Sequence, residues 1–412
     1  MINRTHNPPI NNYPFINNYH PINTINNLNK PQINTSENQR TIPDNPLINN
    51  TSIQDNITLS NNIQIQINKI MEKLQKLEIT NKDLLYKILD RLTIDKQKIF
   101  LNELQSLIDT LSSKYIEKKL HPKVVKAIKK STNGLSRNKV KREFETLKDF
   151  AIKLLTDLID VLADPNLIFQ QHKGTCVKTI IERSIAERNP TQYVKIITDL
   201  ITKGEYIAPN GQRIPLNEGG IKKALFEIDN RYLTTRIITP SLMEFYYDKD
   251  PNKNDYDDDR DEPSGSLFEK TASAIYNTEY NSIDVGYFNK FNNTQKTLIL
   301  KTLLKKSKYP IFLAVNYRKD PNDNNALHGV ELKSITDNSI TISNPWGQIE
   351  TYTTTGKNIE PASKNTKIQN YQDFIKRITF IIFSKELLLL AIKSEPLLSK
   401  LLPNIYYPKK MK

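Results

Sequence analysis

The sequence predicts an α+β protein in which helices come first and an antiparallel sheet follows. Apolar residues recur at helical spacing over much of residues 63–203. Residues 309–316 form a nearly continuous apolar run that is typical of a buried strand. Residues 328–343 alternate between apolar and polar side chains on either side of a turn, as the strands of a hairpin do. Helices followed by strands are the order of elements expected of an α+β fold.

The composition excludes several classes of protein. The 412 residues contain a single cysteine, which excludes an internal disulfide framework and a cysteine-based zinc site. No window of about 18 uninterrupted apolar residues is present, so we expect no membrane span. The N-terminal residues show no basic region followed by an apolar run, so we expect no classical signal peptide. We therefore expect a cytoplasmic location, or export without such a signal, as for a secreted effector.

The N-terminal 62 residues are expected to be a disordered arm. The first fifty residues contain fifteen Asn and seven Pro, and their isoleucines follow neither a helical nor a strand period. Such a segment buries too little apolar surface to offset the entropy lost on ordering. It is either an interaction arm or a neutral low-complexity extension.

Residues 63–117 carry a helical pattern with two interpretations. Apolar residues alternate in steps of four and three with one polar position, Asn81: the series is Ile63, Ile67, Ile70, Leu74, Leu77, Asn81, Leu84 and Ile88. This is the seam of a coiled coil, in which a polar core residue sets register and oligomeric state. The coiled coil would join two copies or bind a partner helix. Alternatively, the helices form an amphipathic pair that packs against the rest of the chain.

Residues 118–149 are expected to be a basic linker or helix. Ten Lys or Arg and no acidic residue lie within 118–142. This segment could contact phosphate backbones or anionic lipid headgroups, and the net charge of +14 points the same way. The alternative is a solvated helical face, since the abundance of Lys, Asn and Ile is also what an AT-rich genome produces.

The single cysteine, Cys176, lies where a reactive thiol is expected. Apolar residues at helical spacing begin directly after it with Val177. A thiol at a helix N-terminus faces the positive end of the helix dipole, which favours the thiolate. Gln170 lies six residues before the cysteine.

A second candidate group lies about 150 residues downstream. His328 begins the first strand of the predicted hairpin, and Asn344 ends the returning strand. The hairpin therefore brings the two side chains together. The Asn344 oxygen then holds one imidazole nitrogen while the other faces the thiol. Trp346, the only tryptophan, follows two residues later and would shield that hydrogen bond from water.

These segments resemble the papain-like cysteine peptidases. The residues that carry the resemblance are Gln170–Cys176, His328 and the sequence Asn344-Pro345-Trp346-Gly347, whose Asn-Pro-Trp-Gly pattern is most similar to the calpain branch. The resemblance covers roughly residues 150–385 and implies a two-lobed core, with one helical lobe and one antiparallel β lobe. It implies that Cys176 is the nucleophile, His328 the general base and acid, and Asn344 the residue that orients His328. Gln170 and the Cys176 N–H would form the oxyanion hole.

Two positions depart from the family pattern, and they leave alternatives open. Val177 replaces the usual Trp after the cysteine, and Gln171 replaces a common Gly, so Gln171 competes with Gln170 for the oxyanion role. The leading hypothesis is hydrolysis of a peptide or isopeptide bond in a protein substrate. The alternatives are an acyltransferase, transglutaminase-like enzyme or deamidase, and an inactive interaction module.

We expect no cofactor. The acidic segment 248–262 begins with the alternating oxygen ligands of a calcium loop, but its sixth position is Lys253, where such loops need Gly. We therefore interpret this segment as a surface insertion. Residues 386–412 are expected to be a C-terminal helical tail.

Overall fold

The computed structural model describes residues 50–80, 82–133, 146–170, 175–217, 219, 221, 231–247, 265–283, 290–317, 327–360 and 368–394. The chain divides into a unit that ends at Ile53 and a second unit, Gln54–Lys412, which holds all of the packing discussed below. The second unit combines helices with an antiparallel seven-stranded sheet, so the predicted α+β class is confirmed. Most of the predicted arm, Asn81, Gln171 and the acidic segment 248–262 lie outside the described residues.

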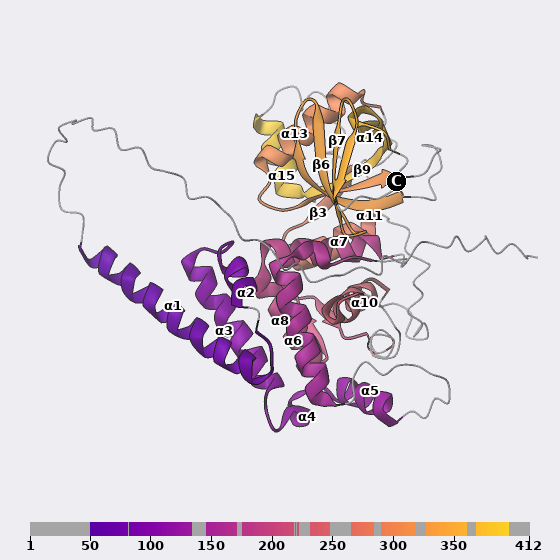
Figure 1. Ribbon diagram of the computed structural model, residues 1–412. Helices are drawn as coiled ribbons and strands as arrows, with labels where there is room; N and C mark the ends of the chain where they lie inside the picture. Colours follow the sequence, from indigo (N-terminus) through magenta and orange to yellow (C-terminus); the bar gives the residue numbers. More distant parts are fainter. Residues whose placement is uncertain are drawn as a thin grey trace, which may run out of the picture. The chain divides into compact units, whose positions relative to one another are not determined.

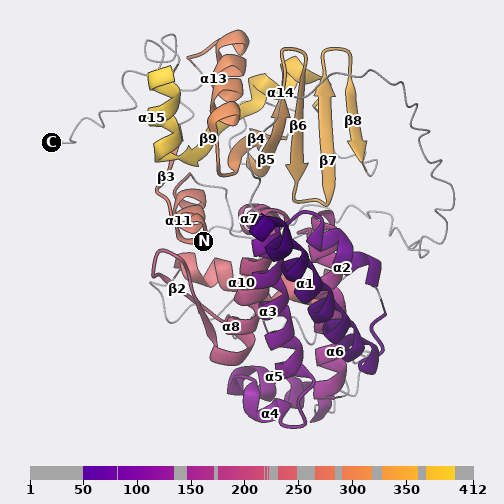
Figure 2. The same ribbon diagram turned by 90° about the vertical axis from the view of Figure 1, so that its left-hand side faces the viewer.

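The predicted seam is buried by the chain's own helices. The first helices are α1 (Asn50–Lys76), α2 (Lys82–Leu89), α3 (Ile94–Leu111), α4 (Ile116–Lys119) and α5 (Pro122–Asn133). Helices α1 and α3 lie side by side (Figures 1 and 2), joined by a 2.7 Å hydrogen bond from Gln66 to Asn102 and by the Lys73–Asp109 ion pair. Ile70 is fully buried. This packing is what the second interpretation, a helical pair within one chain, expects.

Two details of this region differ from the sequence pattern. Helix α1 begins at Asn50, so the end of the segment expected to be disordered is helical. A helix extends readily from a turn that already exists, because each added residue gains one hydrogen bond. The seam is also not continuous, because α1 ends at Lys76 and Glu78 adopts a left-handed φ of 64°. The chain turns there, which lets α2 pack against α6.

The middle of the chain forms a second group of helices. These are α6 (Leu147–Ala163), a short 3-10 turn (Pro165–Leu167), α7 (Cys176–Arg188), α8 (Pro190–Lys203), α10 (Leu233–Tyr247) and α11 (Gly265–Tyr276). Between α8 and α10, the chain forms a hairpin from β1 (Glu205–Ile207) and β2 (Arg213–Pro215), with Asn210 and Gly211 in its turn. Gly211 has a φ of 84°, a left-handed conformation that glycine adopts without steric cost.

Helix α7 is the central helix of this group. It contacts α6, α8, α10, α11 and strand β5 (Leu327–Ile335). Every residue from Cys176 to Ala186 is buried, including Lys178, Glu182 and Arg183. A helix that is covered on all sides has no solvent-facing polar side. Burial of a polar group costs less when the group is hydrogen-bonded, and Glu182 and Arg183 form hydrogen bonds with neighbouring elements.

The sheet contains seven strands in the order β3-β9-β4-β5-β6-β7-β8, and every neighbouring pair is antiparallel (Figure 2). Its strands besides β5 are β3 (Tyr280–Ile283), β4 (Ile311–Asn316), β6 (Ser339–Asn344), β7 (Gln348–Thr353), β8 (Lys357–Glu360) and β9 (Ile378–Ser384). The helices that accompany it are α13 (Asn293–Lys306), α14 (Tyr371–Arg377) and α15 (Lys385–Ser394). The predicted hairpin over residues 328–343 is present as β5 and β6.

Strand β4 separates two hydrophobic cores. Ile311, Leu313 and Val315 belong to one core, which they share with α13 and α14. Phe312 and Ala314 face the other core, which continues into the helices around α7. Because both faces are covered, the whole strand is buried, as its continuous apolar sequence predicts.

No helix among the described residues is both long and apolar enough to span a membrane. Helix α15 accounts for the start of the expected C-terminal helical tail, and residues 395–412 lie outside the described part of the chain.

Candidate functional site

The thiol lies at the first residue of α7. Cys176 is 4% exposed, and Thr175 precedes it as the N-cap residue. The Thr175 hydroxyl lies 3.2 Å from the Thr179 hydroxyl instead of accepting a hydrogen bond from the first turn. The thiol is therefore placed at the positive end of a thirteen-residue helix. This is the position that the apolar spacing after the cysteine predicts.

His328 and Asn344 are in direct contact. The hairpin places His328 at the second residue of β5 and Asn344 at the last residue of β6. The Nε2 atom of His328 lies 2.8 Å from Oδ1 of Asn344, and both side chains are buried. The contact predicted from the length of the hairpin is therefore present.

The neighbours of Asn344 define which imidazole nitrogen carries the proton. The backbone N–H of Trp346 donates to Oδ1 of Asn344 at 3.0 Å, and Nδ2 of Asn344 donates to Oε1 of Glu350 at 2.6 Å. The amide oxygen therefore faces His328 as an acceptor, so Nε2 of His328 is the donor. In a neutral imidazole the other nitrogen, Nδ1, then holds a lone pair and can accept a proton.

Aromatic rings enclose the imidazole. Trp346 stacks on His328 with ring centroids 4.2 Å apart, and Tyr317 meets the imidazole edge-on at 5.1 Å. Burial lowers the pKa of His328 to about 4, against the opposing effect of the hydrogen bond to Asn344. His328 is thus neutral at pH 7 and can serve as a base.

Strand β5 packs closely on α7, which brings the two candidate groups to neighbouring elements. A Cβ atom at Gly329 would lie 3.6 Å from Cγ2 of Val177 and only 2.5 Å from Cζ of Phe268. Gly329 directly follows His328, and Val177 directly follows Cys176. The residues that follow the imidazole and the thiol therefore lie close together, and a side chain at position 329 would overlap Phe268 on α11.

Two charged side chains tie α7 to the hairpin. Arg183, seven residues after Cys176 and hence on the same face of α7, donates from Nη1 to the carbonyl oxygen of Asn344 at 2.8 Å. At the end of the helix, Arg188 Nη2 lies 2.7 Å from Oε1 of the buried Glu331 on β5. Burial alone would raise the pKa of Glu331, but Lys333 and Arg188 outweigh it and lower the pKa.

Gln170 is joined to the turn that follows Asn344. Its backbone N–H donates to the carbonyl oxygen of Pro345 at 2.8 Å, and the residue is 7% exposed. In the same turn, Gly347 has a φ of 86°, and a Cβ atom there would lie 3.4 Å from Cβ of Phe169. The segment before the cysteine and the turn after Asn344 are therefore packed together. The competing residue, Gln171, lies outside the described part of the chain.

Sequence reasoning missed the groups that hold Asn344. Glu350 is fully buried on β7, where Gln348, Glu350 and Tyr352 face inward and Ile349 and Thr351 are half-buried. Apolar alternation would place Ile349 on the inward face instead. The one sequence feature that could have indicated this network is Glu350 itself, which lies six residues after Asn344 and faces the same side of β7 as Gln348 and Tyr352.

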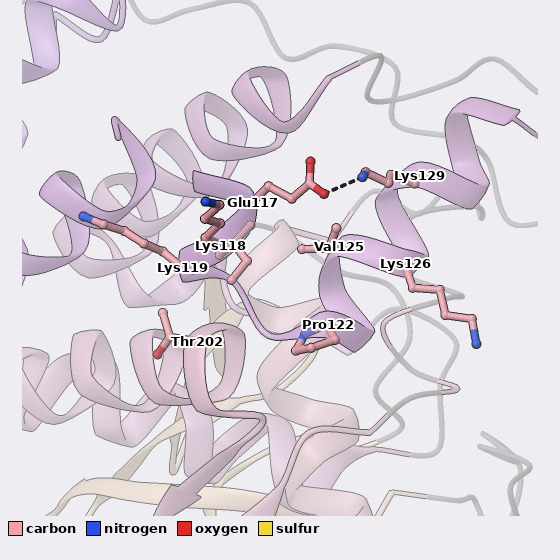
Figure 3. Close-up of a pocket in the computed structure, with 9 residues that line it drawn as sticks. Glu117, Lys118, Lys119, Pro122, Val125, Lys126, Lys129 and Thr202 are labelled. Carbon is pink, nitrogen blue, oxygen red and sulfur yellow. Dashed lines mark hydrogen bonds and ion pairs between the residues drawn. The ribbon is translucent and has the colours of Figure 1, made fainter. Parts of the chain in front are cut away.

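One surface hollow is lined by residues other than these. It has a volume of about 790 Å³ and is lined from α4, α5 and α8, with four lysines around it: Lys118, Lys119, Lys126 and Lys129 (Figure 3). Glu117, the acidic residue that lines it, is paired with Lys129 at 2.5 Å. The hollow therefore carries part of the positive charge that the sequence places in residues 118–142.

Among the described residues, no three His, Cys, Asp or Glu side chains are grouped so that they could hold a metal ion. Comparison of the chain with protein-family models, with curated proteins and with solved structures finds no match.

Proposed function

We propose that the protein is a cysteine peptidase that hydrolyses peptide or isopeptide bonds through an acyl-enzyme on Cys176. The observation that carries this proposal is the His328–Asn344 hydrogen bond, with the amide oriented by Trp346 and Glu350. This oriented imidazole lies on a strand that packs on the helix whose first residue is the cysteine.

In the first half of the reaction, Nδ1 of His328 accepts the proton of the Cys176 thiol. The sulfur then attacks the carbonyl carbon of the substrate, and the carbonyl electron pair moves to oxygen. When this intermediate collapses, the C–N bond breaks, and the amine leaves with the proton that His328 returns. A thioester on Cys176 remains.

In the second half, His328 accepts a proton from water, and the hydroxide attacks the thioester carbonyl carbon. The C–S bond breaks, the acid product leaves, and His328 returns the proton to the sulfur. Asn344 keeps the imidazole in one orientation and one tautomer through both halves.

The backbone N–H of Cys176 and the side-chain amide of Gln170 are proposed to donate to the oxyanion. Removal of one such donor costs enzymes roughly 10²- to 10³-fold in kcat. The bond from Gln170 to Pro345 supports this role, because it fixes the glutamine backbone beside the turn that carries Trp346.

A thiol-directed activity probe tests the proposal on the full chain. Wild-type protein should be labelled at Cys176, and His328→Ala should lose the labelling while it keeps the wild-type thermal transition. Cys176→Ala controls for labelling elsewhere. Absence of labelling in folded wild-type protein would exclude every mechanism that proceeds through Cys176, and would leave an inactive interaction module.

Products separate hydrolysis from the other thiol mechanisms. N-terminal profiling of protein mixtures treated with wild type or Cys176→Ala should reveal new peptide termini that only the wild type creates. Amine adducts or released ammonia without new termini would instead indicate acyl transfer or deamidation.

We further propose that the lysine hollow determines where the enzyme acts. Four exposed lysines and one paired acid favour an anionic partner, which is either a phosphate backbone or a layer of lipid headgroups. This surface belongs to α4, α5 and α8, which do not carry Cys176, His328 or Asn344.

A further inference from the structure

Glu350 is a buried carboxylate that directly contacts the amide of Asn344. Its side chain accepts three hydrogen bonds from neutral donors. Nδ2 of Asn344 donates to Oε1 at 2.6 Å, the Tyr317 hydroxyl donates to Oε2 at 2.9 Å, and the Tyr352 hydroxyl also donates to Oε2. Both oxygens therefore have partners, although Glu350 itself is fully buried.

This arrangement costs free energy. Burial raises the pKa of Glu350, and the hydrogen bonds from Tyr352, Tyr317 and Asn344 only partly oppose that effect. Lys357 acts on the carboxyl as a further, weaker favourable charge. A residue of similar size without charge would avoid the desolvation penalty.

The main chain and the side chain of Asn344 are held separately. Arg183 binds the carbonyl oxygen of Asn344, and the backbone of Asn344 pairs with Gln348 across β6 and β7. Glu350 binds only the side-chain amide. Loss of the Glu350 contact would therefore leave the amide held only through its oxygen, by the Trp346 N–H and by His328, while the backbone of the turn stays in place.

We propose that Glu350 is a positioning residue that keeps the oxygen of Asn344 facing His328, and thereby keeps Nδ1 of the imidazole available to Cys176. This inference rests on the proposed function. Without an acceptor at Nδ2, an amide that turned over would present its NH₂ group to Nε2 and favour the wrong tautomer of His328.

The alkylation rate of the thiol tests this role without a substrate. Cys176 is the only cysteine of the chain, so the rate of reaction of the full-length protein with iodoacetamide reports on this thiol alone. We would measure the rate from pH 5 to pH 9. The imidazole of His328 stays neutral down to about pH 4, so it can accept the thiol proton during alkylation at pH 5–6, where an ordinary thiol is almost entirely protonated and unreactive.

Three substitutions separate the acceptor from the charge. Glu350→Leu removes both the acceptor and the charge. Glu350→Asp keeps the charge, but its side chain is one methylene shorter, so the carboxylate lies farther from Nδ2 of Asn344. Glu350→Gln removes the charge and keeps an oxygen for Asn344. We expect the rate at pH 5–6 to fall by about ten- to a hundredfold in the Leu and Asp variants, and to stay within about threefold of wild type in the Gln variant.

A double-mutant cycle shows whether Glu350 acts through Asn344. Asn344→Ala should lower the rate at pH 5–6, and the addition of Glu350→Leu should then cause no further loss. Trp346, the only tryptophan, stacks on His328, so its fluorescence confirms a folded site in each variant. If the Leu variant does not fold, the comparison of the Asp and Gln variants alone tests whether Glu350 positions Asn344.

Three negative results lead to two different conclusions. If folded Leu and Asp variants react as fast as wild type at pH 5–6, Glu350 is not a positioning residue. If Asp reacts like wild type and Gln does not, the charge matters rather than the acceptor, which also overturns the proposal. If the wild-type rate itself does not depend on His328, the proposed function fails instead.

Discussion

Two buried titratable residues near the candidate site respond to pH in opposite directions. Burial lowers the pKa of His328 to about 4 and raises the pKa of Glu182 on α7 to about 7. The hydroxyls of Tyr193 and Thr239 donate to Glu182 at 2.8 and 2.6 Å and partly oppose its shift. Each side chain favours its neutral form in the folded protein. Substitution of one residue at a time is therefore needed to separate the contributions of His328 and Glu182 to the pH dependence of the unfolding free energy.

His328 should make the folded protein less stable as the pH falls from 7 to 5. The unfolded chain binds a proton near pH 6.5, whereas the folded chain does so only near pH 4, so protons favour unfolding in this window. Relative to His328→Gln, wild type should lose about 2 kcal/mol of unfolding free energy between pH 7 and pH 5. Urea unfolding at both pH values measures this difference.

Glu182 provides the control of opposite sign. Its folded pKa lies above the unfolded value, so its contribution is present below about pH 4.5 and is lost as the pH rises toward 7. Relative to Glu182→Gln, wild type should therefore lose stability between pH 5 and pH 7. An equal change with pH in wild type and His328→Gln would contradict the His328 prediction.

At the scale of elements, Phe268 on α11 leaves no room for a side chain at Gly329 on β5. We expect Gly329→Ala to lower the free energy of unfolding by about 1–3 kcal/mol, because the added methyl overlaps Phe268. Denaturant unfolding measures the change.

Partial rescue by Phe268→Leu in the same chain would confirm that the overlap is the cause. Gly356→Ala is the matched control, since a Cβ atom there meets no neighbour within 4 Å. Equal stability of Gly329→Ala and wild type would show that β5 and α11 are not packed as described.

The helical pair α1–α3 gives a second prediction at this scale. Ile70 is fully buried inside the chain, so Ile70→Asp should cost several kcal/mol by placing an unpaired charge in the core. Ile65, which is 52% exposed on the same helix, is the control, and Ile65→Asp should have little effect.

Light scattering distinguishes this packing from a dimeric coiled coil. The Ile70 and Ile65 variants should have the same molar mass as wild type wherever they remain folded. A wild-type dimer that Ile65→Asp converts to monomer would instead support self-association through α1.

The sequence predicted the elements of the candidate site better than their surroundings. The helix after Cys176 and the hairpin from His328 to Asn344 follow from local periodicity, and both are present. The insertion of β9 between β3 and β4 joins distant segments, so no local pattern could reveal it. Glu350 was missed because buried polar residues break the apolar alternation on which strand prediction depends.

At the scale of the whole molecule, positive charge gathers away from the candidate site. We predict that a variant with Lys118, Lys119 and Lys126 changed to Glu elutes from a heparin column at clearly lower salt than wild type. Heparin is a polyanion, and its contacts with clustered lysines weaken as salt screens them. Labelling of Cys176 by the activity probe should be unchanged.

A second triple variant distinguishes the effect of the lysines at the hollow from the effect of total net charge on heparin binding. Lys305, Lys306 and Lys308 lie at and just beyond the end of α13, and their change to Glu alters the total charge equally. This variant should shift the elution less than the first. Equal shifts in the two variants would show that total charge alone sets the affinity, and that the hollow is not a binding surface.

The positions of α7 and the strands along the chain also determine the order in which the candidate site residues are synthesised. The thiol is made before the hairpin, because His328, Asn344 and Glu350 follow about 150 residues later and become a unit only when β5, β6 and β7 pair. A nascent chain that has emerged only as far as α11 thus has the cysteine but not its proposed base. Under the proposed mechanism, the thiol becomes reactive only after these strands are made and the protein can fold around it.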